Sequence, residues 1–252
     1  MATAGTVPWA LLAAANLRWL PSVPWAVPIN AFYLWLFWRY ARGDGWPKAT
    51  SETRRTNLRA NRISEEVWGL ALLAGTLGLV ALLLFQRVLN HLVTLPQQQK
   101  DDLSQVPVAT AVLLVLMASL VAGVVEEASF RGYMQRPIER RHGPVIAIVV
   151  NGSLFGLVHF THPEVGLVLM PYYMGAAAVY GTLAYLTDSI FPGMVLHAAG
   201  NVFVIFDLLA RGQSEWQASP NPDGSFGISV ALFLLVGSAA VGAYVALARC
   251  RS

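Results

Sequence analysis

Residues 107–131 have the sequence PVATAVLLVLMASLVAGVVEEASFR, an apolar run that is uncharged up to Glu126. Its apolar part is about as long as the ~20 residues that a helix needs to cross the hydrocarbon core of a bilayer. An ionisable side chain inside a bilayer costs roughly 2.5–3.5 kcal/mol on insertion scales, so such a residue is expected to have a partner or a function. This stretch therefore predicts a membrane helix that carries a polar site.

The composition of the whole chain is that of an integral membrane protein. Of its 252 residues, 56% are hydrophobic and only 12% are charged, and the mean hydropathy is +0.53. A soluble domain carries about 25% charged residues, roughly twice as many. The single cysteine, Cys250, excludes a disulfide framework and a cysteine metal cluster. We expect the lipid bilayer as a partner and no nucleic acid, because the net charge of +3 is modest.

Seven apolar segments are each long enough for a membrane helix. They lie near residues 23–39, 66–87, 107–130, 144–161, 165–187, 190–209 and 227–247. Residues 5–20 could form an eighth helix, short or interfacial, because Pro21, Pro24 and Pro28 prevent a continuous helix into the next span. The predicted fold class is an all-α, polytopic membrane protein with seven or eight membrane helices and an intramembrane polar site.

The basic residues predict the orientation of these helices. If the N-terminus lies outside, twelve Lys and Arg residues fall in predicted cytoplasmic segments and four in exterior ones. Such a bias in short loops supports an N-outside, C-cytoplasmic topology for seven spans. The basic stretch 40–65 is then expected to be a solvated cytoplasmic loop, with a basic helix lying on anionic headgroups as the alternative.

Three polar signatures interrupt the predicted membrane helices. They are Glu126-Glu127-x3-Arg131, Phe155-x3-His159 and His197-x3-Asn201. Glu126 and His159 are both sixteen residues from a predicted turn at His142–Gly143, so an antiparallel hairpin would place them at one level. The position of His197 in its own span corresponds to a similar depth. The sequence therefore predicts that the three signatures meet in one intramembrane site, open toward the cytoplasmic side.

Helical spacing suggests how the side chains divide their roles. Glu127 and Arg131 are four residues apart, the favourable order for an intrahelical ion pair. Adjacent residues diverge by ~100° around a helix, so Glu126 is expected to point away from Glu127 and to be available for chemistry. His197 and Asn201 share one helix face. Phe155 is expected to be a packing residue.

The residue types fit peptide hydrolysis, which needs a base, a positioned water and hydrogen-bond donors where the carbonyl oxygen becomes charged. Glu126 would be the base, because a carboxylate held away from water is a better base than one in solution. His159 or His197 could position the water, and the amide of Asn201 could donate. The structural alternative is that both histidines only join helices by hydrogen bonds, and that Glu127 and Arg131 form a purely structural pair.

The three signatures, in this order, resemble those of the CPBP family of intramembrane proteases, also called the Abi or CAAX amino-terminal protease family. The family pattern is EExxxR, FxxxH and HxxxN or HxxxD, and eukaryotic members trim prenylated CAAX proteins. The resemblance covers about residues 107–209. It implies an intramembrane endopeptidase with a membrane-associated protein or peptide as substrate.

The resemblance also implies a role for each matched residue. Glu126 would activate water, and Glu127 and Arg131 would orient Glu126. The remaining matched residues would hold the water and the oxyanion. Those remaining residues are His159, His197 and Asn201. On this basis the chain divides into N-terminal membrane helices with a basic cytoplasmic loop (1–106), a CPBP-like catalytic core (107–209), and a C-terminal loop with the last membrane helix (210–252).

Metal dependence and two other functions stay open at this point. Glu126, His159 and His197 could form a zinc site, but Asn201 is a poor zinc ligand and a good hydrogen-bond donor, so a metal-free site is preferred. One alternative function is a non-catalytic scaffold, chaperone or bacteriocin-immunity protein of the same fold. A proton-coupled transporter is less favoured, because no pair of similar halves with broken helices is evident.

Overall fold

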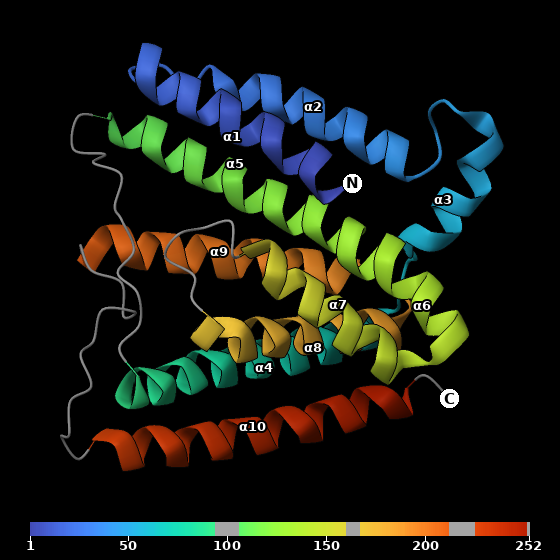
Figure 1. Cartoon of the computed structure of the whole chain (residues 1–252), viewed down its shortest axis with the longest axis vertical. Coiled ribbons are helices and arrows are strands. Elements are labelled where there is room, and N and C mark those ends of the chain that lie inside the picture. Colours follow the sequence, from blue (N-terminus) through green and yellow to red (C-terminus); the bar gives the residue numbers. More distant parts are fainter. Residues whose placement is uncertain (94–105, 160–166, 212–224, 251–252) are drawn as a thin grey trace.

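The computed structural model describes residues 1–93, 106–159, 167–211 and 225–250, and within these ranges every regular element is a helix. The long helices run along roughly one direction (Figure 1). They are α1 (Ala2–Trp19), α2 (Ala26–Ala41), α4 (Glu65–Leu92), α5 (Val108–Glu126), α7 (Pro144–His159), α8 (Met170–Thr187), α9 (Phe191–Arg211) and α10 (Ser225–Arg249). The predicted all-helical, polytopic membrane class is confirmed.

Four helical segments are long and apolar enough to cross a membrane by length and composition. They are Glu65–Leu92, Val108–His142, Leu167–Thr187 and Ser225–Arg249. Two shorter apolar helices accompany them, Pro144–His159 and Phe191–Ile205. The helices α1 and α2, which correspond to the predicted segments 5–20 and 23–39, are not in this set, because their Trp, Tyr, Asn and Arg residues lower the hydropathy.

The predicted third span, near residues 107–130, belongs to a longer helix. The helix continues from α5 through a π-helical segment, Glu127–Met134, into α6 (Gln135–His142). It ends at Gly143, whose φ of 82° lies in the region that glycine adopts without strain. The predicted turn at His142–Gly143 is thus confirmed. A helix over Val108–His142 is about 52 Å long at 1.5 Å per residue, so one end must leave the ~30 Å hydrocarbon core.

Helix pairs form the body of the molecule. α10 packs along α4, α7 packs along α8, and α9 packs along α5 (Figure 1). One buried apolar cluster joins α2 to α5 and includes Phe37, Met117 and Val125. A second cluster joins α4, α8 and α10 and includes Leu82 and Leu183. The candidate polar site lies where α5 and α8 both border α9.

The first two helices form an antiparallel hairpin against α5 (Figure 1). Asn16 is fully buried and stabilises the connection, since its Oδ1 accepts a hydrogen bond from the Ala26 amide at 2.9 Å and its Nδ2 donates to the carbonyls of Leu20 and Val23. The first residues of α1 therefore lie on the same side of the molecule as the last residues of α2. The predicted exterior position of the first residue holds only if α1 does not cross the bilayer.

The basic stretch 40–65 is not simply a solvated loop, and that expectation is wrong for two of its arginines. It contains a single 3₁₀ turn (Lys48–Thr50) and the helix α3 (Ser51–Leu58). Arg54 is buried and donates hydrogen bonds to the carbonyls of Tyr40, Gly45 and Pro47 at 2.5, 3.0 and 2.8 Å. The guanidinium thus replaces water as the partner of three carbonyl groups and fixes the loop.

Arg59 is the second buried arginine, and it joins three parts of the chain. Its guanidinium donates to Glu139 of α6 and lies 3.3 Å from Asp188, in the turn between α8 and α9. Arg136 of α6 also reaches Asp188, at 2.8 Å. Burial lowers the pKa of Arg59, and the hydrogen bond with Glu139 opposes this. We call Arg59, Arg136, Glu139 and Asp188 the Arg59 cluster.

Candidate active site

The site exists because α5 and α9 approach closely at two glycines. A Cβ on Gly123 of α5 would lie 2.8 Å from the carbonyl oxygen of Met194, and a Cβ on Gly193 of α9 would lie 2.6 Å from Oε2 of Glu127. Small residues at such contacts let helix backbones come together inside a membrane. The close approach brings His197 of α9 against the end of α5 and the start of the π-helical segment.

His197 lies between the two adjacent glutamates. Its Nδ1 is 2.9 Å from Oε1 of Glu127, a hydrogen bond in which the ring nitrogen donates to the carboxylate. Its Nε2 is 3.7 Å from Oε2 of Glu126. The glutamates were expected to point in different directions, and this holds only in part. They reach opposite nitrogens of one imidazole, at the point where the wider π-helix begins.

Arg131 forms the predicted ion pair with Glu127. The distance from Nη1 to Oε1 is 3.2 Å, and both side chains are completely buried. The guanidinium also lies 4.7 Å from the ring centroid of Phe155 and 5.1 Å from that of Tyr180. Phe155 was expected to be a packing residue, and it is buried, but it also provides a cation–π contact to Arg131.

His159, at the end of α7, is held by backbone and aromatic groups. Its Nδ1 is 2.7 Å from the carbonyl oxygen of Phe155, so Nδ1 is the donor and the neutral ring has an unprotonated Nε2. The ring stacks on Tyr173 at 4.3 Å between centroids and lies 4.5 Å from Phe155. These contacts of the His159 ring are with residues of α7 and α8. Glu126, in contrast, lies next to His197 of α9.

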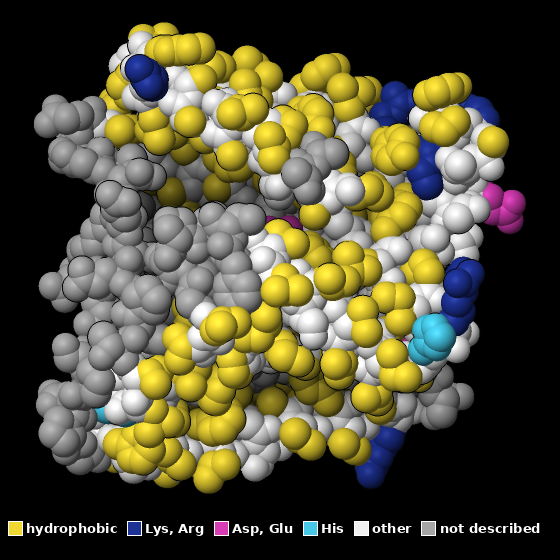
Figure 2. All heavy atoms as spheres, in the orientation of Figure 1, with side chains coloured by type: hydrophobic (Ala, Val, Ile, Leu, Met, Phe, Trp, Pro, Cys, Tyr) yellow, Lys and Arg dark blue, Asp and Glu magenta, His cyan; other side chains and the backbone are white. Residues whose placement is uncertain are grey.

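Glu126 and Asn201 complete the predicted set. Glu126 has 18% of its side chain exposed, while Glu127 is completely buried. Asn201 lies one turn beyond His197 on α9 and is half-buried. Figure 2 shows acidic atoms at the bottom of a hollow between α5 and α7, surrounded by hydrophobic side chains. The site is therefore buried for Glu127 and Arg131 and more open at Glu126.

Five polar atoms of these site residues are buried without a hydrogen-bond partner among the described residues: Oε2 of Glu126, Oε2 of Glu127, and Nε, Nη1 and Nη2 of Arg131. Nearly all buried polar groups in proteins have a partner, in the protein or in ordered water. The site thus has more polar groups than its own side chains pair.

The described residues do not bring together a metal-ligand set. Among them, no group of three or more His, Cys, Asp or Glu side chains is placed so that it could hold a metal ion. The alternative zinc ligands Glu126, His159 and His197 are therefore not arranged as one, because His159 is held among aromatic rings.

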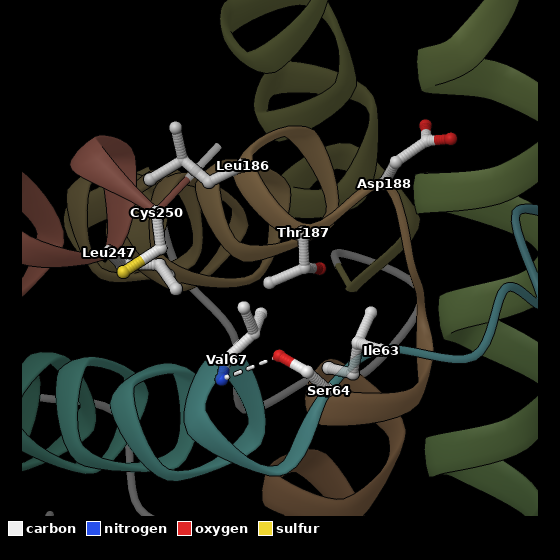
Figure 3. A pocket seen from close by; sticks show the side chains of 8 residues that line it. All are labelled: Ile63, Ser64, Val67, Leu186, Thr187, Asp188, Leu247 and Cys250. Carbon is white, nitrogen blue, oxygen red and sulfur yellow. Dashed lines mark hydrogen bonds between the residues drawn. The ribbon is translucent and has the colours of Figure 1, made fainter. Parts of the chain in front are cut away.

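A separate pocket of about 200 Å³ lies at the ends of α4, α8 and α10 (Figure 3). Leu186, Leu247 and Val67 provide apolar walls. Its hydroxyl groups are already used inside the protein, since Ser64 accepts from the Val67 amide and Thr187 donates to the Leu183 carbonyl. The pocket shares no residue with the candidate site.

Sequence reasoning missed several residues that build the site. Gly193 borders Glu127, and Tyr180 of α8 stacks on His197 with centroids 5.0 Å apart and planes 10° from parallel. Asn151 is completely buried and donates to the carbonyl of Phe130 in the π-helical segment at 3.0 Å. A polar residue within a predicted membrane helix was the available signal for Asn151. Tyr180 and Gly193 carried no such signal.

Fold and site together define a polytopic helical membrane protein with a buried cluster of ionisable residues. Residues 108–203 match the sequence model of a family described as type II CAAX prenyl endopeptidase Rce1-like. The match spans every residue of the three signatures, and it confirms the predicted relationship to CPBP proteases over this part of the chain. Comparisons with curated proteins and with solved structures gave no match.

Proposed function

We propose that this protein is an intramembrane endopeptidase in which Glu126 activates a water molecule. The observation that carries the proposal is the position of His197 between the carboxylates of Glu126 and Glu127, with Glu127 also paired to Arg131. In this arrangement the carboxylate of Glu127 is held by two partners, whereas the carboxylate of Glu126 lies beside the more open part of the site. The proposal also rests on the family match over residues 108–203.

The charges of the site support proton chemistry. We call Glu126, Glu127, Arg131 and His197 the Arg131 cluster; two carboxylates and one guanidinium give it a net charge of −1 when His197 is neutral. One proton, held at Nε2 of His197 or at Oε2 of Glu126, balances this charge. The two atoms are 3.7 Å apart, so a proton can pass between them once they approach to hydrogen-bond distance, about 0.5–1 Å closer.

The reaction then follows with atoms balanced. Glu126 takes a proton from water while the water oxygen bonds to the scissile carbonyl carbon. The carbonyl oxygen becomes an oxyanion. When the C–N bond breaks, the leaving nitrogen receives the proton, from Glu126 or from protonated His197, and the products are a carboxylic acid and an amine, which become a carboxylate and an ammonium group when the acid proton is transferred. General acid–base catalysis of this kind contributes typically about 10²–10⁴-fold.

Glu127 and Arg131 act by orientation. Glu127 accepts the Nδ1 proton of His197, which directs Nε2 toward Glu126, and Arg131 compensates the charge of Glu127. Asn201 is a better candidate than His159 for donating a hydrogen bond to the oxyanion, because its amide donates at any pH. His159 is proposed to help position the water. The site is proposed to work without a metal.

The proposed substrate is a membrane-associated protein or peptide, and a prenylated CAAX chain is the specific candidate that the family description suggests. The test uses purified protein and an internally quenched peptide that ends in Cys-a-a-X and is farnesylated on the cysteine, with the unprenylated peptide as control. We expect cleavage of the prenylated peptide and about 10²-fold less or no cleavage by Glu126→Gln. Equal cleavage by wild type and Glu126→Gln would remove the assignment.

We further propose that the site opens toward the cytoplasm, from the distribution of basic residues. In a protein with Cys250 replaced by serine, cysteines at Arg55 and Arg140, which are both exposed, should react with an impermeant thiol reagent only from the cytoplasmic side. A cysteine at Val108, which is 78% exposed at the start of α5, should react only from the exterior. The reverse pattern would invert the orientation.

A further inference from the structure

An uninterrupted stack of side chains runs through the candidate site. Tyr173 stacks on His159, His159 contacts Phe155, and the ring of Phe155 lies 4.7 Å from the guanidinium of Arg131. The ring of Tyr180 lies 5.1 Å from the same guanidinium and stacks in turn on His197. The stack thus connects the two histidines of the predicted site through Arg131. Tyr180 is the member that joins Arg131 to His197.

The position of Tyr180 constrains the plane of the His197 ring. The hydrogen bond from Nδ1 to Glu127 fixes one atom of the imidazole but permits the ring to tilt about that contact. A nearly parallel ring, 10° away, restricts this tilt. The plane of the ring decides where Nε2 lies, and Nε2 must stay within reach of Oε2 of Glu126 for a proton to pass between them.

Tyr180 is also suited to this role by its surroundings. It is 5% exposed and sits in the buried cluster of α8 with Val179 and Leu183, so its ring is held by packing on a rigid helix. The guanidinium of Arg131 lies 5.1 Å from the centroid of the same ring, and an aromatic ring attracts a cation at such a distance. Tyr180 therefore contacts both the imidazole of His197 and the guanidinium that pairs with Glu127.

We propose that Tyr180 is a positioning residue that holds the imidazole of His197 in the plane required for proton transfer with Glu126. This inference rests on the proposed peptidase function. Stacking uses the face of the ring, which phenylalanine keeps and leucine or methionine loses. The role therefore predicts that Tyr180→Phe behaves as wild type, whereas Tyr180→Leu and Tyr180→Met do not.

The kinetic test measures kcat and KM on the quenched farnesylated peptide. We expect Tyr180→Leu to lower kcat by about 10- to 100-fold with KM changed by about twofold or less, because the plane of His197 matters in the transition state and not for substrate binding. Tyr180→Met serves if the leucine variant does not fold. The matched control is Tyr244→Leu on α10, whose hydroxyl donates to the Val179 carbonyl beside Tyr180, and it should keep kcat.

A second readout separates failure of this inference from failure of the proposed function. Side-chain ¹⁵N resonances of labelled histidine report the tautomer and surroundings of His197, assigned by comparison with His197→Asn. Tyr180→Leu should shift or broaden the His197 signals and Tyr180→Phe should not, even if the peptide is no substrate. The inference is overturned if Tyr180→Leu leaves both kcat and the His197 signals unchanged, or if Tyr180→Phe loses as much as Tyr180→Leu.

Discussion

The molecule holds two buried clusters of arginines and carboxylates, and they differ in their charge balance. The Arg59 cluster contains two arginines, Arg59 and Arg136, and two carboxylates, Glu139 and Asp188, so its charges sum to zero. The Arg131 cluster has two carboxylates for one arginine, so its charges do not sum to zero when His197 is neutral. We infer that the balanced cluster joins helices and the unbalanced cluster is built to exchange a proton.

The clusters differ too in what they connect. Arg59 follows α3 with a left-handed backbone, at φ 57°, and reaches α6 and the turn between α8 and α9. Its neighbours Asn61 and Ser189 continue the junction, since the Ser189 hydroxyl donates to the Asn61 carbonyl at 2.8 Å. The Arg131 cluster instead joins α9 to the continuous helix formed by α5 and the π-helical segment.

The largest expected effect on stability is at Arg131. Arg131→Leu leaves Glu127 buried without its cation, and breaking a buried pair in this way costs about 3–5 kcal/mol. Arg59→Leu should cost less, because Glu139 keeps a second cation, Arg136, at 3.6 Å. Thermal unfolding in detergent measures both. Adding Glu127→Gln to Arg131→Leu should restore part of the lost stability. A larger loss of stability in Arg59→Leu than in Arg131→Leu would contradict the comparison.

The next effect is on turnover, at the contact between α9 and Glu127. Gly193→Ala places a Cβ 2.6 Å from Oε2 of Glu127, so the carboxylate or the helix must shift. A displacement of about 1 Å in a catalytic arrangement can cost about 10²-fold in rate. Gly200→Ala on the same helix is the control, since a Cβ there meets nothing within 4 Å. Equal turnover in the two variants would show that the close approach does not position Glu127.

The smallest effect is expected at the partly exposed member of the Arg59 cluster. Asp188 has 42% of its side chain exposed and a left-handed backbone, with φ 49°. Asparagine tolerates that conformation, so Asp188→Asn should lose only the ion pairs, worth up to about 1 kcal/mol in water. Turnover should not change. Asp188→Val should be distinctly less stable, because a β-branched residue is strained at positive φ; equal stability of the two variants would argue against this.

The sequence predicted those features that depend on local spacing. The apolar lengths located most of the helices, Gly143 marked the turn, and the four-residue spacing of Glu127 and Arg131 gave their ion pair. It did not predict the π-helical segment, because a π-helix depends on tertiary contacts such as the hydrogen bond from Asn151 to the Phe130 carbonyl. The wider turn explains why both glutamates reach one histidine.

Contacts between residues that are far apart in the sequence could not be predicted either. Arg59 and Glu139 are eighty residues apart, and a basic stretch predicts exposure as long as its partners are unknown. The stack through Tyr180 needs α8 beside both α9 and the π-helical segment, an arrangement that no spacing along one helix encodes. The roles of the six predicted site residues in catalysis stay predictions.

The most direct test of the difference between the clusters compares two isosteric changes, Glu126→Gln and Glu139→Gln, by turnover per folded molecule and by melting temperature. We predict opposite patterns. Glu126→Gln should lose about 10²-fold or more in turnover with little change in stability, because it removes the base and leaves the Glu127–Arg131 pair intact. Glu139→Gln should keep turnover and melt earlier, because it removes the main partner of buried Arg59. Wild-type turnover by Glu126→Gln, or the same pattern in both variants, would contradict the account.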